Sequence, residues 1–334
     1  MSERNPILIT GAGGQVGGVS RVMIDMLLEQ GHPVRAFVRR DDERAQSLRE
    51  AGAEVFVGDL LNLADVASAL KGVRRVYFSM SAQPYYADAI TVMAAAARAQ
   101  GDIEAFVNMS NYEQSYMTLE KMTAPDEERR SWLGGLVTDW SPQQRAHWVS
   151  ERVLDWSGLP TVNVRATMFA ESPHLTWMQV GPLSNGELRL PYGNQRIAPI
   201  AVHDLAEVCV KLLLDPAPHI SKSYALTGPE LKDMYGFAED YAAALGRQVT
   251  YIPEEVEAWN EAFMDENLQK ALGDPAVAQH VAAHLKIQAR LIAGGRYDVL
   301  SDQLETLLGR PPRTMRWALQ NNTRLRELAA APNQ

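Results

Sequence analysis

A cluster of glycines near the amino end of the chain constrains its fold most strongly. Five glycines stand within the eight positions 11 to 18, between the apolar run PILIT and the amphipathic run VSRVMIDMLLEQ. Glycine costs chain entropy and adds no packing, so this density indicates that another group approaches the backbone closely. Gly11, Gly14 and Gly17 have the spacing GxxGxxG between a predicted strand and a predicted helix. Backbone N–H groups and the positive end of a helix bind a pyrophosphate in such a turn, so we predict a dinucleotide-binding turn rather than a purely structural one.

Short β-rich runs alternate with helical runs from residue 6 to about residue 166. The predicted strands are PILIT, PVRAFV, AEVFVG, RRVYFSM, IEAFVNM and PTVNVRA. Strands that alternate with helices form a parallel sheet covered on both faces. We therefore predict an α/β protein whose residues 1–166 form a Rossmann-like, doubly wound parallel sheet, with an insertion at 112–141 that is a lid or an interface element. Residues 167–334 are predicted to form a smaller, mainly helical C-terminal substrate lobe, with short strands at QRIAPIAV, KSYALTG and YIP.

The composition excludes several classes of partner. The 334 residues carry a net charge of -9, and no apolar run approaches the roughly 18 residues of a membrane span. An acidic chain without a basic patch argues against nucleic acid and anionic membranes as partners. The polar amino end lacks the apolar core of a signal peptide, so we expect a cytoplasmic protein that acts on a small molecule. The single cysteine, Cys209, is expected in the core, and a homodimer is compatible with the sequence.

The residue at the tip of the second predicted strand selects the dinucleotide. An acidic residue there accepts a hydrogen bond from a ribose 2′-OH, whereas an arginine accommodates a 2′-phosphate. Arg39 and Arg40 occupy this tip, which favours NADP(H); the alternative is that they only pair with Asp41 and Asp42. The third strand ends at Asp59, which either reaches the adenine or caps the following helix.

These residues resemble the NmrA-like branch of the atypical short-chain dehydrogenase/reductase superfamily. TGAGGQVGG, VRAFVRR, VFVGDL, HWVSERVLDWSGLPTVNVRATMFAES, LTGPE and ALGRQVTYIP follow the order of that family over about residues 5 to 255. The most specific pattern is ExxLxxSGLxxxxxRxxxFxE; the chain departs from the family at RATMF, where a proline often follows the arginine. The resemblance implies a Rossmann-like domain that usually binds NADP(H). Its members are either reductases of quinones, dyes, imines or enol ethers, or non-catalytic dinucleotide-sensing regulators.

The resemblance also implies a set of cofactor-binding residues. The glycine turn would hold the pyrophosphate, the second strand tip the 2′-phosphate, the third strand end the adenine, the fourth and fifth strand ends the ribose, and segment 166–169 the nicotinamide. In chain order the residues are Gly11, Gly13, Gly14, Gln15, Val16, Gly17, Arg39, Arg40, Asp59, Leu60, Ser79, Met80, Ser81, Asn108, Met109, Ser110, His147, Ala166, Thr167, Met168 and Phe169.

The tyrosine and the lysine four residues later, which ordinary members of the superfamily use, are missing as a pair. None of the 11 tyrosines has a lysine at i+4, and His147 and Glu151 stand at the expected places. His147 is the candidate catalytic residue, either orienting a ribose hydroxyl or donating a proton; packing beside Trp148 is the alternative. Losing a general acid costs about 10²- to 10⁴-fold, whereas positioning a hydride donor contributes about 7 to 11 kcal/mol. The sequence therefore favours an acceptor that takes hydride readily, such as a quinone, an iminium compound or a cationic dye.

Other residues leave alternatives open. We expect no metal site, because His280 and His284 have an i, i+4 spacing on a predicted solvated helix without an evident third ligand. Aromatic residues near the predicted strand ends indicate either an aromatic-substrate pocket or ordinary packing: Tyr85, Tyr112, Tyr116, Trp132, Trp140, Phe169 and Trp177. Two functions remain, an NADPH-dependent oxidoreductase of a small conjugated or aromatic electrophile and a non-catalytic NADP(H)-sensing regulator that acts through a protein partner.

Overall fold

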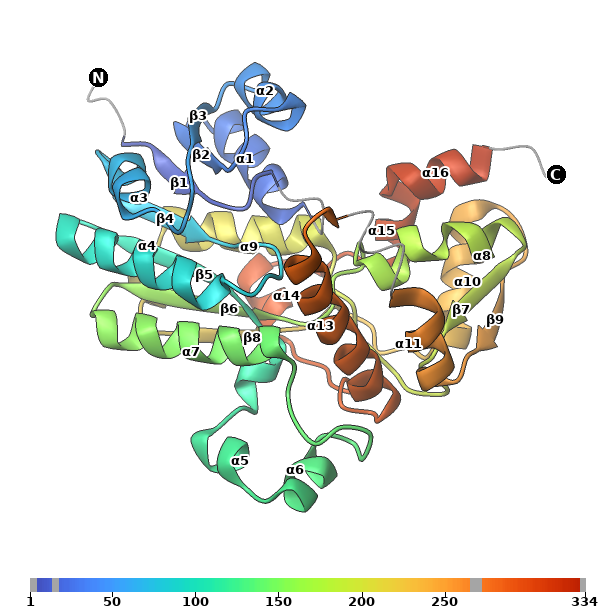
Figure 1. The fold of residues 1–334 in the computed structure, drawn as a ribbon. Coiled ribbons are helices and arrows are strands. Elements are labelled where there is room, and N and C mark those ends of the chain that lie inside the picture. The colour runs from blue at the N-terminus through green and yellow to red at the C-terminus, as the bar shows by residue number, and fades with distance from the viewer. Residues whose placement is uncertain (1–4, 14–17, 265–271, 331–334) are drawn as a thin grey trace. The chain divides into compact units, whose positions relative to one another are not determined.

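The computed structural model describes residues 5–13, 18–264 and 272–330 (Figure 1). The chain forms two compact units and passes between them several times. The first unit comprises Met1–Ser115, Arg145–Ala166 and His203–Ala225. The second comprises Tyr116–Gln144, Thr167–Val202 and Leu226–Gln334. The 166/167 boundary expected from the sequence is one of these passages.

A seven-stranded sheet forms the first unit, in the order β3-β2-β1-β4-β5-β6-β8. The strands are β1 Ile7–Ile9, β2 Val34–Val38, β3 Glu54–Val57, β4 Arg75–Phe78, β5 Ala105–Asn111, β6 Thr161–Ala166 and β8 Ser223–Leu226. Neighbouring strands from β3 to β6 pair in parallel. The predicted Rossmann-like α/β fold is confirmed, and the order of the strands reverses between β1 and β4.

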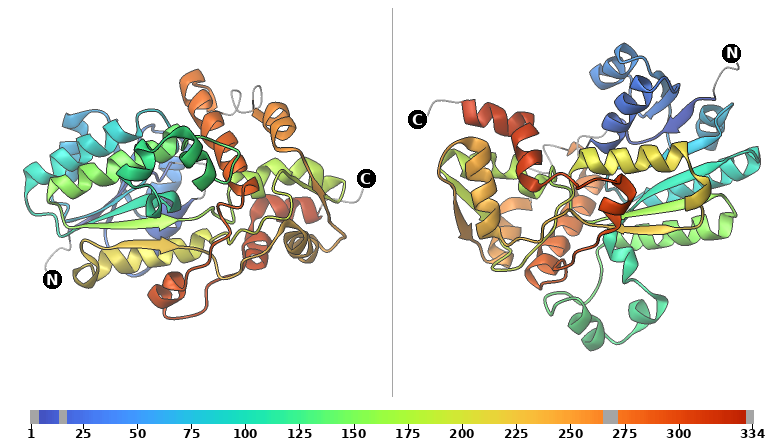
Figure 2. Two further views of the ribbon diagram at one scale, coloured as in Figure 1. Left: turned by 90° about the horizontal axis from the view of Figure 1, so that it is seen from below. Right: turned by 180° about the vertical axis from the view of Figure 1, so that it is seen from behind.

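Helices cover both faces of this sheet. They are α1 Val19–Glu29, α2 Glu43–Glu50, α3 Leu63–Leu70, α4 Tyr86–Gln100, α7 Pro142–Ser157 and α9 Val202–Leu214. Along β4, Val76 and Phe78 join the buried cluster formed with α3, α4 and α7, whereas Tyr77 faces Cys209 of α9. Figure 2 shows α9 on the side of the sheet opposite α4 and α7. Cys209 is fully buried, which confirms its predicted place in the core.

The second unit is mainly helical. Its helices are α5 Leu119–Thr123, α6 Asp126–Trp132, α8 Val180–Ser184, α10 Met234–Leu245, α11 Val256–Met264, α13 Pro275–Ala293, α14 Gln303–Leu308, α15 Met315–Asn321 and α16 Thr323–Ala330. Its strands β7 Glu187–Leu190 and β9 Thr250–Pro253 pair in parallel. The predicted strand at YIP is confirmed as β9. The predicted strand at QRIAPIAV is wrong, because this segment makes only isolated bridges, Ile197 with Lys232 and Ile200 with Phe169.

Short 3-10 turns connect several elements. They are η1 Tyr112–Ser115, η2 Pro173–Leu175, η3 Trp177–Gln179 and η4 Ala217–His219. No helix within the described ranges is long and apolar enough to cross a membrane.

Candidate nucleotide site and aromatic pocket

Thr10 joins the ends of β1 and β4 at the point where the strand order reverses. Its hydroxyl lies 2.8 Å from the carbonyl oxygen of Ser79, to which it donates, and 2.9 Å from the backbone nitrogen of Ser79, from which it accepts. Its own carbonyl accepts a hydrogen bond from Ser20 of α1 at 2.8 Å. In open α/β sheets, ligands bind outside the carboxyl ends of the strands at such a reversal.

The glycine turn begins directly after this corner. Gly11 has a φ of +74°, and a Cβ there would lie 2.7 Å from the carbonyl oxygen of Ser79, so only glycine fits without a shift. The turn ends at Gly18, the N-cap of α1. The predicted residues Gly14, Gln15, Val16 and Gly17 lie outside the described residues.

Arg44 is a residue of this corner that the sequence did not single out. Its guanidinium donates to the carbonyl oxygen of Gly13 at 2.6 Å and pairs with Asp42 at 2.5 Å. The Arg44 hydrogen bonds hold the pKa of the Asp42 carboxyl at about 2. Asp42 also accepts hydrogen bonds from the first backbone N–H groups of α2, as its N-cap. No feature of the sequence distinguished Arg44 from the other arginines between 39 and 49.

Arg39 and Arg40 are exposed at the end of β2. The alternative that they pair with the adjacent aspartates is wrong. Asp41 pairs with Arg49 at 2.7 Å and Asp42 pairs with Arg44, so the two tip arginines have no carboxylate partner among the residues that the structure describes. Their charges remain available to an anion.

Asp59 follows β3 and lies half-buried. Its carboxylate accepts a hydrogen bond from the backbone of Leu61 at 2.9 Å, and Asn62 is the N-cap of α3. The alternative that Asp59 caps this helix is therefore wrong. Leu60 packs against the buried cluster of α3 and α4, as does Met80 after β4.

A buried ion pair stands at the ends of β5 and β6. Glu151 of α7 is 1% exposed and accepts from Ser110 at 2.6 Å and from Arg165 at 2.6 and 3.0 Å. Glu151 and Arg165 are the first acid and the arginine of the ExxLxxSGLxxxxxRxxxFxE pattern. The place where the superfamily carries a lysine is therefore filled by a carboxylate that is neutralised by an arginine.

His147 lies one helical turn before Glu151 on α7 and is half-buried. Its ring centroid lies 4.4 Å from that of Tyr86, at an interplanar angle of 52°. The Tyr86 hydroxyl is buried, donates to the carbonyl oxygen of Met109 at 3.1 Å, and has its pKa raised by burial and by the charge of Glu151. Among the two neighbours, the tyrosine is thus held in its neutral form, and the imidazole is the more exposed group.

The other predicted ribose and nicotinamide residues are buried or packed. Asn108 is buried and donates to Asn163 of β6 at 2.9 Å. Met109 is buried, Ser79 is half-buried and Ser81 is exposed. Ala166 ends β6 in the first unit.

The segment that follows β6 belongs to the second unit. Thr167 is buried, with its hydroxyl 3.0 Å from the carbonyl oxygen of Ala198, and Met168 is buried beside it. Phe169 is half-buried and forms a bridge to Ile200. Glu171, the last acid of the pattern, accepts from the backbone of Val202 at 3.0 Å.

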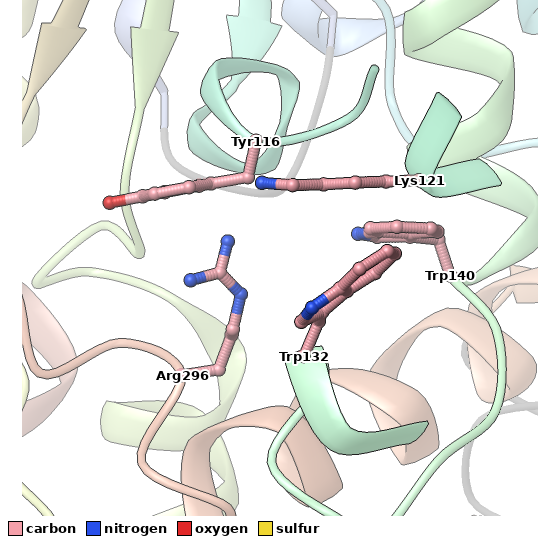
Figure 3. Close-up of a pocket in the computed structure, with 5 residues that line it drawn as sticks. All are labelled: Tyr116, Lys121, Trp132, Trp140 and Arg296. Atoms are coloured by element: carbon pink, nitrogen blue, oxygen red, sulfur yellow. The ribbon is translucent and has the colours of Figure 1, made fainter. Parts of the chain in front are cut away.

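The predicted aromatic pocket is present in part. Tyr116, Trp132 and Trp140 of the insertion line a cavity of about 200 Å³, together with Lys121 and Arg296 (Figure 3). Tyr112 is buried and Tyr85 is exposed, and neither lines this cavity. The two cations were not foreseen, because Arg296 lies far from the insertion in the sequence.

The histidine pair of α13 is not solvated as expected. His284 lies 2.8 Å from the hydroxyl of Ser141, and His280 lies 2.8 Å from the amide oxygen of Gln143. Burial lowers the pKa of His284 to about 4, and the nearby His280 adds to this. These contacts attach α13 to the end of the insertion.

The comparison with protein families decides the class of ligand. A family model described as NAD(P)H-binding matches residues 11–216. The chain belongs to this NAD(P)H-binding family. The match includes the corner at Gly11, both tip arginines and the Glu151–Arg165 pair, and it confirms the predicted nicotinamide dinucleotide.

Relatives of this NAD(P)H-binding chain span nearly its whole length. An NAD(P)H azoreductase from Xenophilus azovorans is 25% identical over 310 residues, which are 92% of this chain and 94% of that protein. A structure of an NADPH-dependent quinone oxidoreductase from Escherichia coli, complexed with NADPH, has a TM-score of 0.71 and 23% identity, covering 94% of this chain and 98% of that one. The negative transcriptional regulator NmrA has a TM-score of 0.70 and 17% identity, covering 98% of both chains. The two structures confirm that the fold is NmrA-like.

Proposed function

We propose that this protein is an NADPH-dependent oxidoreductase that transfers hydride to a small conjugated or aromatic electrophile of the quinone, imine, iminium or dye type. The observation that carries this proposal is the pairing of Glu151 with Arg165 and Ser110 where a catalytic lysine is expected. This arrangement lies in a chain of the NAD(P)H-binding family. A nicotinamide cofactor can therefore bind, whereas the proton relay of ordinary superfamily members is replaced by a closed ion pair.

The corner after β1 fits a dinucleotide. Its backbone approaches Ser79 too closely for a side chain at Gly11, and α1 begins at Gly18, so the positive end of α1 is near. We propose that this turn binds the pyrophosphate. Asp59 and Leu60 would border the adenine, and the ends of β4 and β5 would border the ribose. Segment 166–169 would face the nicotinamide.

Arg39 and Arg40 support NADPH over NADH. Both guanidinium groups are exposed at the tip of β2 and neither has a carboxylate partner within the described part of the chain. A hydrogen bond to a charged group contributes about 1.5 to 3 kcal/mol, which corresponds to roughly a 10- to 150-fold preference for the phosphorylated cofactor.

The residues around the reacting position restrict the class of acceptor. A bound nicotinamide supplies the hydride. Glu151 accepts from Ser110 and Arg165, and the Tyr86 hydroxyl donates to a carbonyl oxygen, so these groups are committed to structural bonds. His147 is then the candidate for orienting a ribose hydroxyl or passing a proton. Because general acid catalysis is weak in this arrangement, acceptors that need no protonation before hydride arrival are favoured.

A relative supports the reductase. The chain matches the NAD(P)H azoreductase over nearly the full length of both proteins, and azo compounds are conjugated electrophiles. The alternative is a non-catalytic NADP(H)-sensing regulator. Its support is the similarity of the fold to the transcriptional regulator NmrA, together with the missing tyrosine–lysine pair.

Consumption of NADPH distinguishes the two functions. Purified protein is mixed with NADPH and a panel of quinones, iminium compounds and azo and cationic dyes, and the absorbance of the reduced nicotinamide is followed. Turnover that His147→Ala reduces by about 10- to 100-fold, with unchanged NADPH affinity, supports the oxidoreductase. Tight binding of NADPH without turnover across the whole panel contradicts the oxidoreductase and favours the regulator.

A further inference from the structure

The cavity of the second unit carries a chemical signature of its own. Its five lining residues are Tyr116, Lys121, Trp132, Trp140 and Arg296. Three are aromatic, two are cationic and none is a carboxylate. Tyr116 follows η1, Lys121 lies on α5, Trp132 ends α6, and Arg296 follows α13, so segments distant in the sequence converge here (Figure 3).

The two cations converge on one aromatic ring. The guanidinium carbon of Arg296 lies 3.7 Å from the ring centroid of Tyr116, and the ammonium nitrogen of Lys121 lies 5.9 Å from the same centroid. Figure 3 shows both groups pointing toward Tyr116. Cation–π attraction is only part of what a charge loses on leaving water, so two like charges beside one ring are best compensated by an anion.

Lys121 has no carboxylate partner among the described residues. A nearby arginine of the insertion differs in this respect. Arg129 donates to the carbonyl oxygens of Ala124 and Thr138 and pairs with Asp126 at 2.6 Å. The positive charge at the cavity therefore belongs to Lys121 and Arg296, while Arg129 holds the insertion together.

The walls suit a flat ring. Trp140 is 2% exposed and fixed in position, whereas Trp132 is 39% exposed, so one indole forms the floor and the other borders the opening. The cavity of about 200 Å³ is somewhat larger than a cavity of about 150 Å³ that holds benzene. It accommodates one aromatic ring with a small charged substituent and excludes larger ring systems unless they extend outward.

The frame of the cavity is fixed by contacts that need no ligand. Ser141 and Gln143 at the end of the insertion bind His284 and His280 of α13, and Gly134 packs directly on Gly294. Arg296 follows two residues later, and its backbone N–H donates to Leu291 at 2.9 Å. The cations and the rings are therefore positioned in advance, which lowers the entropic cost of binding.

We propose that this cavity is a binding site for single-ring aromatic anions, with the ring between the indoles and the carboxylate or sulfonate toward Lys121 and Arg296. The site concerns binding alone and does not rest on hydride transfer. A protein that binds such an anion without oxidising NADPH would retain this site and lose the proposed oxidoreductase function.

Calorimetry and quenching of tryptophan fluorescence test the site without NADPH. Benzoate and benzenesulfonate are compared with neutral benzamide, cationic benzylammonium and the non-aromatic anion acetate. We expect both aromatic anions to bind at least tenfold more tightly than the other three. Equal affinity for benzamide removes the role of the cations, and equal affinity for acetate removes the role of the rings; either result overturns the proposal.

Variants of the two cations give the second test. Lys121→Gln and Arg296→Gln are each expected to weaken benzoate binding about tenfold or more. Arg313→Gln is the matched control, because Arg313 also lies over an aromatic ring, that of Trp317 at 4.7 Å, but does not line the cavity. If Arg296→Gln impairs folding, Lys121→Gln decides, since its side chain has no ion pair to lose. Unchanged benzoate affinity in Lys121→Gln contradicts the proposal.

Discussion

Gly134 and Gly294 pack backbone against backbone in the second unit. A Cβ on Gly134 would lie 2.5 Å from the carbonyl oxygen of Gly294, and a Cβ on Gly294 would lie 2.7 Å from the carbonyl oxygen of Gly134. The contact joins the turn after α6 to the end of α13. It thereby fixes the distance between Trp132 and Arg296, which lie two residues away on either side of the aromatic pocket.

Gly294→Ala should open the aromatic pocket. Gly294 has a φ of -81°, which alanine adopts freely, so the only cost is the clash with Gly134. We expect a loss of about 1 to 3 kcal/mol in the free energy of unfolding, measured by urea denaturation, and weaker benzoate binding. Gly181→Ala is the control, because a Cβ there meets nothing within 4 Å; it should leave both quantities unchanged or gain slightly in stability. Equal effects of the two substitutions would contradict the role of this contact.

Arg39→Ala should change the choice of cofactor. Arg39 is exposed at the end of β2 and has no carboxylate partner among the described residues, so its loss removes a charge contact to the 2′-phosphate alone. We expect the NADPH dissociation constant to rise about 10- to 150-fold while that of NADH changes little, measured by calorimetry. Arg49→Ala is the control, since Arg49 is paired with Asp41. Equal losses for both nucleotides would reject the assignment.

The sheet and the corner at Gly11 were predictable because their signals are local. A strand, a glycine turn and a helix are adjacent in the chain, and alternation of strands and helices fixes a parallel sheet. The segment at Ile197 and Ile200 misled because apolar alternation was read as a strand, whereas the residues make single bridges to distant segments. Strand formation there needed a partner that the sequence does not reveal.

The pairing of side chains was harder to predict than their presence. The pattern containing Glu151 and Arg165 was visible, but the 14 residues between them hide a direct ion pair. Arg296 and Arg44 were missed for the same reason, since their contacts depend on how separate segments pack. Arg39 was foreseen because its neighbours in the sequence are also its neighbours at the tip of β2.

Glu151→Gln should destabilise the first unit. The substitution keeps the shape of the side chain but leaves the guanidinium of Arg165 without its counter-charge in a largely buried position. We expect a loss of about 2 to 4 kcal/mol in the free energy of unfolding. Asp155→Asn on the same helix breaks a more exposed pair with Arg152 and should cost less than about 1 kcal/mol. Urea denaturation compares the two variants, and similar small losses would show that the buried pair contributes little.

Stability should fall as the pH is lowered from 7.5 to 5, through buried histidines of the second unit. Burial lowers the pKa of His284 to about 4 and that of His174 to about 3. Between these values and about 6.5, the unfolded chain binds more protons than the folded chain, so the free energy of unfolding rises with pH; each histidine accounts for about 2 kcal/mol between pH 5 and neutrality. His284→Asn keeps a hydrogen-bonding group near Ser141 and removes the titration, so it should reduce the pH dependence by roughly half. Ser141→Ala removes only the partner hydroxyl, and it should lower stability at both pH values while retaining most of the slope. Thermal unfolding at the two pH values measures this, and an unchanged slope in His284→Asn would show that His284 is not the titrating group.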